Sequence, residues 1–317
     1  MRRALLFTAV LWGCQSPPAA PPPSTLTGEL SLSGAWALYP LAVRWADAFM
    51  ALHPGVRLHV AAGGSGRGAV DVLDGFVDLG MLSRAPSAEE VARGAWALPV
   101  ARDAVVIIAS DDNPALEELR ARGISRREAA ALYGGGRADP NWAMLAPATG
   151  TAPLRAYTRA DACGTDEVLA TWLGLDPDAL AGVGVFGDPG LAEVVRRDPW
   201  GLGYTNASTA YDPGGGRPIS GLAVLPVDLD DDDAIATDEA ACADLPALDA
   251  AAAAGRYPAG LVRDLFLVTR GTPEDPLLRA FLEWVVGDGQ AVVAKAGHIA
   301  LSPEALAGAR EVVGVGK

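Results

Sequence analysis

The sequence Arg159-Ala160-Asp161-Ala162-Cys163-Gly164-Thr165 decides the fold, because it joins a strand-like stretch, 154–158, to a helical pattern over 166–173. It brings an arginine, a carboxylate that can hold it, and then small residues to the start of a helix. The first backbone N–H groups of a helix have no partner inside the helix, and the helix dipole makes that end positive. Small residues let an anion approach these groups, and an arginine can close over it. The segment therefore predicts an anion site where a strand meets a helix.

A second segment, Gly63-Gly64-Ser65-Gly66-Arg67-Gly68, repeats this arrangement after the alternating strand pattern of 56–60. Two helix starts from distant parts of the chain suggest two sides of one oxyanion site. From residue 30 onward, strands and helices alternate with short turns, which is typical of α/β layers. Near the end, a buried strand over 264–269 precedes two helices, the second predicted from about 288 to 296.

Length and charge limit the class of protein. A chain of 317 residues is long enough for two α/β domains with separate cores. Its hydrophobic fraction of 50% and charged fraction of 20% indicate a folded globular protein. The net charge of −14 argues against nucleic acid and anionic lipid surfaces as partners. Local donors must therefore bind any anion, because the overall field does not attract it.

The N-terminus has the pattern of an export signal. A short positive start and an apolar run too short to span a bilayer lead to Leu11-Trp12-Gly13-Cys14. This box resembles a bacterial lipoprotein cleavage site and predicts a signal peptide over 1–13 and a lipid on Cys14. The proline-rich residues 14–28 predict a flexible tether. We expect a periplasmic protein of the bacterial cell envelope, anchored only by that lipid; a plain secretory signal is the alternative.

Four groups of residues resemble the substrate-binding protein of the high-affinity phosphate importer, a type II periplasmic binding protein. They occur in the family's order, and the likeness covers about 30–315: residues 34–41, 64–68, 78–84 with 99–106, and 159–165 with 201–204. The resemblance implies an α/β fold with two lobes, each a mainly parallel sheet flanked by helices, joined by a two-strand hinge. Lobe I would contain 29–102 plus 262–317, and lobe II 103–261, with hinge crossings near 101–105 and 261–265.

The resemblance also implies that phosphate is held by hydroxyls, helix amides and one arginine. Arg159 matches the ligand arginine and Asp161 the carboxylate that orients it. The first loop has no hydroxyl and could offer only backbone N–H groups, and a cysteine, a poorer donor, replaces a serine at position 163. The implied ligand-binding residues are Ala35, Trp36, Ala37, Ser65, Gly66, Ser83, Arg159, Asp161, Cys163, Gly164 and Thr165.

Each of these assignments has an alternative. Arg159 and Asp161 could be a structural ion pair, and Ser83 and Arg84 could be surface capping residues. Trp36 could fill a core or stack on a ligand larger than phosphate. Because Ser83 carries no charge where some members have an aspartate, a carboxylate that would tell protonated phosphate from sulfate is missing. Sulfate, molybdate and phosphonate therefore stay open as ligands.

An acidic run is a separate candidate. Asp228, Asp230, Asp232 and Glu239 fall at positions 1, 3, 5 and 12 of a calcium loop of the EF-hand type, but Asp233 stands at position 6, where glycine is usual. We expect a solvated acidic loop without metal, and calcium binding is the alternative. Calcium is the only cofactor that the sequence suggests.

The cysteines Cys163 and Cys242 could form a disulfide in an exported protein, or Cys163 could be a free thiol beside the ligand. Enzyme motifs are incomplete. Arg67 stands where the G-x-S-x-G nucleophile elbow needs glycine, and the histidines, His53, His59 and His298, have no metal-binding spacing.

We therefore expect an exported, monomeric oxyanion-binding protein, not an enzyme, that delivers phosphate to an ABC permease of the inner membrane. An anchored sensor that has lost transport is the alternative from another class, and a hydrolase using Ser65 is the third.

Overall fold

The computed structural model describes residues 26–135, 139–161, 163–236 and 240–314. The predicted signal peptide, the predicted lipidation site Cys14, most of the predicted tether and Glu239 lie outside these ranges. Within them, no helix is both long and apolar enough to cross a membrane.

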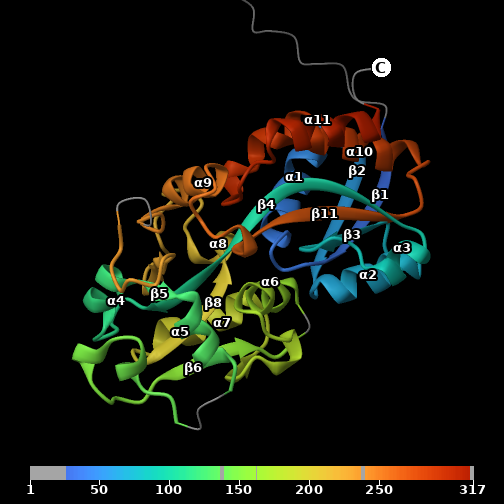
Figure 1. Cartoon of the computed structure of the whole chain (residues 1–317). Coiled ribbons are helices and arrows are strands. Elements are labelled where there is room, and N and C mark those ends of the chain that lie inside the picture. The colour runs from blue at the N-terminus through green and yellow to red at the C-terminus, as the bar shows by residue number, and fades with distance from the viewer. Residues whose placement is uncertain (1–25, 136–138, 162, 237–239, 315–317) are drawn as a thin grey trace, which may run out of the picture.

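One sheet path runs through the molecule (Figure 1), and its strands follow the order β2-β1-β3-β11-β4-β8-β6-β7, with β9 also paired to β4. The strand bounds are β1 (Gly28–Gly34), β2 (Val56–Ala62), β3 (Leu79–Leu82), β4 (Ala95–Ser110), β6 (Arg155–Arg159), β7 (Val183–Val185), β8 (Gly201–Asn206), β9 (Leu222–Leu225) and β11 (Val262–Arg270). A separate two-stranded sheet joins β5 (Ile124–Ser125) to β10 (Val227–Asp228).

This sheet is mixed, and the expectation of two mainly parallel sheets is wrong in that respect. The neighbours β2-β1-β3 and β8-β6-β7 are parallel, but every pairing of β4 and β11 is antiparallel. The antiparallel pairings centre on β4, which has 16 residues and serves both ends of the path. Its first part, to Ala104, pairs with β11, and from Val105 it pairs with β8. A single strand therefore connects both ends of the path.

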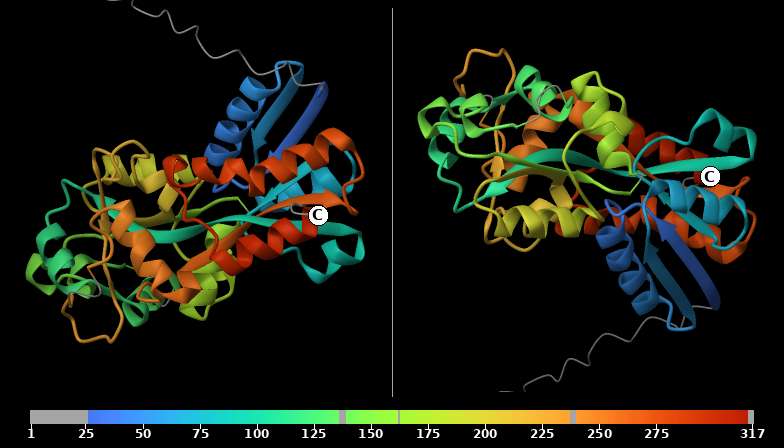
Figure 2. Two further views of the ribbon diagram at one scale, coloured as in Figure 1. Left: turned by 90° about the horizontal axis from the view of Figure 1, so that it is seen from above. Right: turned by 90° about the horizontal axis from the view of Figure 1, so that it is seen from below.

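Helices cover this sheet on both sides (Figure 2). Their bounds are α1 (Tyr39–Leu52), α2 (Ser65–Leu73), α3 (Ala88–Ala92), α4 (Leu116–Arg122), α5 (Arg126–Tyr133), α6 (Gly164–Leu173), α7 (Asp188–Arg197), α8 (Ala207–Ala210), α9 (Leu245–Ala253), α10 (Pro276–Val286) and α11 (Pro303–Val313). Short 3-10 turns occupy Trp142–Met144, Pro147–Thr149, Pro177–Ala179, Ala259–Leu261, Asp288–Val292 and Ala294–Ala296.

The single helix predicted over 288–296 is two 3-10 turns. The carbonyl oxygen of Gly289 accepts a hydrogen bond from Trp45 Nε1 at 2.8 Å. A Cβ on Gly289 would lie 3.1 Å from the ring of Trp284, so the chain comes closer to this ring than other residues allow. Packing against two tryptophans therefore replaces the regular helical ladder here.

Buried apolar side chains gather in two main clusters. One contains residues from 30–101 and 265–313, and the other contains residues from 104–261 together with Ile299. Figure 1 shows the corresponding groups of elements at the upper right and the lower left, with β4 and β11 running between them. Two packing centres joined by two strands are an arrangement that permits hinge motion. The lobe boundaries named above stay a prediction.

Candidate functional site

The carboxyl ends of two sets of parallel strands face each other. Strands β1, β2 and β3 end in the loops that lead to α1, α2 and residue 84, and β6, β7 and β8 end near the starts of α6, α7 and α8. The carbonyl of Gly34 accepts the N–H groups of Gly63 and Gly64 at 2.8 and 3.0 Å, which ties the first two loops together. Ligands of open α/β sheets bind at such carboxyl edges. We call these two sets of loops the first edge and the second edge.

Helix α2 begins deep inside the first edge. A Cβ on Gly68 would stand 2.7 to 2.8 Å from backbone atoms of β1 and β3, so only glycine lets the helix come this close to the sheet. Ser65, 1% exposed, places its Oγ 3.0 Å from Ser83 Oγ and accepts the Ser83 N–H at 3.0 Å. The first N–H groups of α2, including that of Gly66, precede its hydrogen-bond ladder. The predicted residues Ser65, Gly66 and Ser83 therefore lie together.

One of the three first-loop amides predicted to face a ligand, that of Ala35, already has a partner. The Ala35 N–H donates to the Met81 carbonyl at 2.7 Å, because the loop continues the β1–β3 pairing, so it is not free. The Ala37 carbonyl is held by His298 Nε2 at 2.7 Å. Trp36 reaches the second edge and meets Phe186 edge-on, with ring centroids 6.2 Å apart. Trp36 therefore contacts the opposite edge instead of filling a core.

Arg159 lies between two carboxylates. Its Nε and Nη2 donate to Asp161 at 2.9 and 2.6 Å, which confirms that Asp161 holds it. Its Nη1 lies 2.6 Å from Asp188 Oδ2, and the arginine side chain is not exposed at all. Burial lowers the pKa of Arg159, but the charges of Asp188 and Asp161 more than offset this and raise it. Asp188, at the start of α7, was not predicted; the sequence Gly187-Asp188-Pro189 has the pattern of a helix start.

Helix α6 begins against the first edge. A Cβ on Gly164 would collide with Ser83 Oγ and stand 3.1 Å from the Ser83 carbonyl oxygen. The Thr165 hydroxyl lies 3.2 Å from Asp188 Oδ1 and 3.0 Å from Asn206 Oδ1, so it already has partners of its own. Cys163 precedes the helix, and burial raises the pKa of its thiol, which keeps it protonated. Cys163 and Cys242 are both buried and free, so the disulfide alternative is wrong.

Two further side chains of this region have partners that the sequence did not reveal. Arg84 forms a two-bonded pair with Glu90 at 2.7 and 2.8 Å, and its Nε lies 3.3 Å from Glu167 on α6. It therefore connects the two edges and is more than a capping residue. Burial raises the pKa of Asp166 to about 6, while the Tyr204 hydroxyl, which donates to it at 2.6 Å, opposes that change.

Sequence reasoning also missed Arg263 on β11 and Asp103 on β4. Arg263 Nη2 donates to Thr165 Oγ1 at 3.2 Å and to Asn206 Oδ1, and lies 3.5 Å from Asp103 Oδ2. Asp103 is completely buried; burial raises its pKa, and the charge of Arg263 opposes that rise. A charged residue inside an otherwise apolar strand run is the signal that could have identified both.

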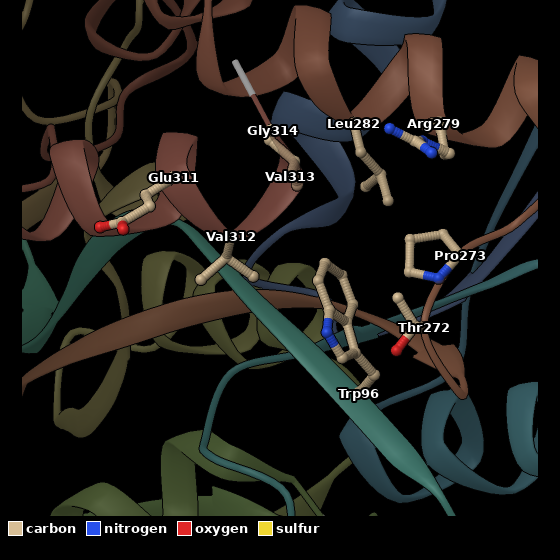
Figure 3. Close-up of a pocket in the computed structure, with 9 residues that line it drawn as sticks. All are labelled: Trp96, Thr272, Pro273, Arg279, Leu282, Glu311, Val312, Val313 and Gly314. Atoms are coloured by element: carbon tan, nitrogen blue, oxygen red, sulfur yellow. The ribbon is translucent and has the colours of Figure 1, made fainter. Parts of the chain in front are cut away.

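One cavity borders the place where the two edges meet, and its lining includes the predicted residues Arg159, Asp161 and Cys163; another lies away from it. A cavity of about 280 Å³ opens beside Arg159, and Asp161, Asp166, Glu167 and Asp178 give it an acidic lining. A larger one, of about 490 Å³, lies between α10, α11 and the loop after β11 (Figure 3). Its lining contains none of the predicted ligand residues: Trp96, Thr272, Pro273, Arg279, Leu282, Glu311, Val312, Val313 and Gly314.

The acidic run forms a loop in which the carboxylate oxygens of Asp228, Asp230 and Asp232 lie within 4.8 Å of one another. Asp228 is buried, and its carboxylate accepts the N–H groups of Asp231 and Asp233 at 2.8 and 3.0 Å. Both of these residues have left-handed backbones, with φ of 61° and 65°. Internal hydrogen bonds thus hold the loop, and calcium binding stays a prediction.

Comparison with known proteins places this geometry in a family. A family model described as the PBP superfamily domain matches residues 19–289. No curated protein matches the sequence at a significant level.

Several solved structures share the fold. A protein described as a phosphate ABC transporter substrate-binding protein with bound phosphate, from Clostridium perfringens, has 21% identity and a TM-score of 0.68, over 87% of this chain and 100% of that chain. An ABC-type phosphate transport receptor from Vibrio cholerae has 16% identity and a TM-score of 0.60, over 86% and 100%. A possible phosphate-binding protein from Planctomyces limnophilus has 18% identity and a TM-score of 0.58, over 92% and 99%. At these identities the likeness establishes a common fold.

Proposed function

We propose that this chain, which belongs to the PBP superfamily, binds a small inorganic oxyanion where its two carboxyl edges meet. One observation carries the proposal: the start of α6 touches Ser83, which in turn is bonded to Ser65 at the start of α2. Two positive helix ends and two hydroxyl groups therefore lie close together where the edges meet. Such ends bind anions without a basic surface, which suits a chain with a net charge of −14.

Phosphate is the ligand that we favour. The fold is shared with proteins whose names describe phosphate transport or phosphate binding. The first loop and Ser83 offer no carboxylate, so nothing in these segments selects protonated phosphate over sulfate or molybdate. The likeness to phosphate proteins therefore carries the choice of ligand, and the site geometry carries the choice of an oxyanion.

Binding would bring the edges together around the hinge strands β4 and β11. Three contacts join the edges in the described structure: Trp36 with Phe186, Arg84 with Glu167, and Ser83 with Gly164. Each connects a residue before 102 with one between 164 and 186. We propose that these contacts form on closure and break on release, as in other hinged binding proteins.

In the cell, the protein would be a lipid-anchored monomer of the envelope that passes its anion to an ABC permease. This part of the proposal rests on residues 1–28 and on the family, since the anchor lies outside the described residues. The first loop favours a second candidate, a sensor that binds without transport, because it contributes no hydroxyl and its Ala35 amide is occupied. Complementation of a phosphate-uptake mutant separates the two: a transporter restores growth on low phosphate, and a sensor does not.

Calorimetry tests the binding itself. The mature protein is titrated with phosphate, sulfate and molybdate at one ionic strength, and its melting temperature is measured with each. A dissociation constant near 1 μM corresponds to about 8 kcal/mol, and a thousandfold excess of anion would then add about 4 kcal/mol to the free energy of unfolding. We expect phosphate to give the largest effect. If none of the three anions gives either binding heat or a thermal shift, the proposal is refuted.

A further inference from the structure

We propose that Arg263, on the hinge strand β11, supplies the guanidinium that contacts the bound oxyanion, and that Arg159 is a structural cation that frames the second edge. This inference rests on the proposed function and names the central donor of the same site. It differs from the expectation raised by sequence, in which Arg159 has the binding role. Four observations carry it.

The first is hydrogen bonding. Arg263 is 5% exposed at its side chain, and its Nε and Nη1 have no acceptor among the described residues. A guanidinium has five N–H donors, and leaving buried donors without acceptors costs free energy. Arg159 differs, because its Nε and Nη2 bind Asp161. Its Nη1 makes no well-aligned hydrogen bond, but it lies only 2.6 Å from Asp188 Oδ2.

The second is position. Arg263 Nη1 lies 3.2 Å from the point where a Cβ on Gly164 would stand, and that same point collides with Ser83 Oγ. The guanidinium, the start of α6 and the serine pair of the first edge therefore lie close together in the described structure. An oxyanion admitted between the edges when they part would give the unpaired N–H groups of Arg263 an acceptor, while its other oxygens would meet Ser83 and the helix amides.

The third is charge. Arg159 faces two carboxylates within 2.6 Å, so its charge is already balanced. Arg263 has Asp103 as its nearest carboxylate, at 3.5 Å and without a hydrogen bond, and burial favours the neutral form of that group by raising its pKa. Of the two arginines, Arg263 is the one whose only carboxylate partner among the described residues lies beyond hydrogen-bond contact.

The fourth is the place of Arg263 in the fold. It pairs across the strands with Asp103, one residue before β4 exchanges β11 for β8 as its partner. Its Nη2 bonds Thr165 and Asn206 of the second edge. An anion bound to this side chain would link β4 and β11 to α6, so binding and closure would occur together.

Calorimetric titration with inorganic phosphate compares the wild type with Arg263→Gln, Arg263→Lys, Arg159→Gln and the control Arg270→Gln. Arg270 is an exposed arginine on the same strand. We expect Arg263→Gln to weaken binding at least thirtyfold, since a charged hydrogen-bond partner is lost, with Arg263→Lys between it and the wild type. Arg270→Gln should match the wild type. Arg159→Gln should mainly lower the melting temperature, because it leaves two carboxylates buried without their cation.

The outcomes separate the two proposals. If the wild type binds phosphate and a folded Arg263→Gln keeps its affinity within threefold, the role of Arg263 is refuted and the proposed function stands. If the wild type binds none of the three anions, both the proposed function and the role of Arg263 are refuted.

A second measurement covers the case in which Arg263→Gln does not fold. Arginine labelled with ¹⁵N in the wild-type protein gives Nε resonances, and Arg263→Lys identifies that of Arg263. We expect this resonance to move on addition of phosphate more than that of Arg159. A resonance of Arg263 that stays in place while phosphate binds would overturn the inference.

Discussion

Replacing Gly164 with alanine should prevent the two edges from closing. The added Cβ would collide with Ser83 Oγ and stand 3.1 Å from the Ser83 carbonyl oxygen and 3.2 Å from Arg263 Nη1. Rotation of the serine relieves only the first of these contacts, because the second involves backbone. An excess methyl group in a packed site costs about 1 to 3 kcal/mol, which corresponds to a loss of roughly 5- to 150-fold in affinity.

The matched control is Gly308→Ala in α11, a helix glycine away from both edges. A Cβ on Gly308 meets nothing within 4 Å, so the same chemical change should leave anion affinity as it is. The fold should survive Gly164→Ala, because its clash lies between the edges and outside both main apolar clusters. Adding Ser83→Ala to Gly164→Ala should restore part of the closure but remove one hydroxyl donor. Calorimetry with phosphate and a melting curve for each variant measure these effects. Wild-type affinity in a folded Gly164→Ala would refute the closed geometry on which the site depends.

Three further predictions concern groups beside the junction and away from it. Because burial raises the pKa of Asp166 to about 6 from 3.8, the folded state holds its proton more tightly than the unfolded state; this contribution to stability is present below pH 3.8 and is lost as pH rises to about 6. Asp166→Asn should therefore flatten the fall in stability over that window relative to the wild type, as measured by urea unfolding at several pH values, and an unchanged slope would contradict it. Asp228→Ala should lower the free energy of unfolding by about 1 to 3 kcal/mol, because two backbone N–H groups lose their acceptor. EDTA should leave the melting temperature of the wild type unchanged, and a large drop with EDTA would instead indicate a structural ion. Burial also raises the pKa of the Cys163 and Cys242 thiols, so a thiol reagent should label both only after unfolding, and rapid labelling of the native protein would count against their burial.

Local sequence patterns predicted the parts of the fold that depend on neighbours in the chain. Ser87 and Ser125 each form a capping box with the glutamate three residues later and begin a helix, a pattern that can be read from four consecutive residues. The glycine-rich segment before α2 and the small residues at the start of α6 are local signals of the same kind. They identify which backbone amides a helix leaves unpaired, because that depends only on where the helix begins.

The partners of buried charges could not be predicted in the same way. Arg159 meets Asp161 two residues away, which the sequence predicts, and also Asp188, which arrives from another helix start. Arg263 and Asp103 become neighbours only through the antiparallel register of β11 and β4. Such pairings depend on strand order and register, and hydrophobic periodicity does not determine them when strands are buried on both faces.

This difference decides which arginine is available to a ligand. A sequence motif identifies Arg159 by its position before a helix. An arginine binds a ligand anion well only if carboxylates of the protein do not already neutralise its charge. With Asp161 and Asp188 both in contact, Arg159 together with these groups has a net negative charge, which would repel an oxyanion. The Thr165 hydroxyl stands between Asp188 and Arg263, because it donates to the first and accepts from the second. Arg263 has one carboxylate at 3.5 Å, that of Asp103, whose neutral form is favoured by burial, whereas Arg159 has two carboxylates at 2.6 Å. We therefore expect an anion to meet less negative charge at Arg263 than at Arg159.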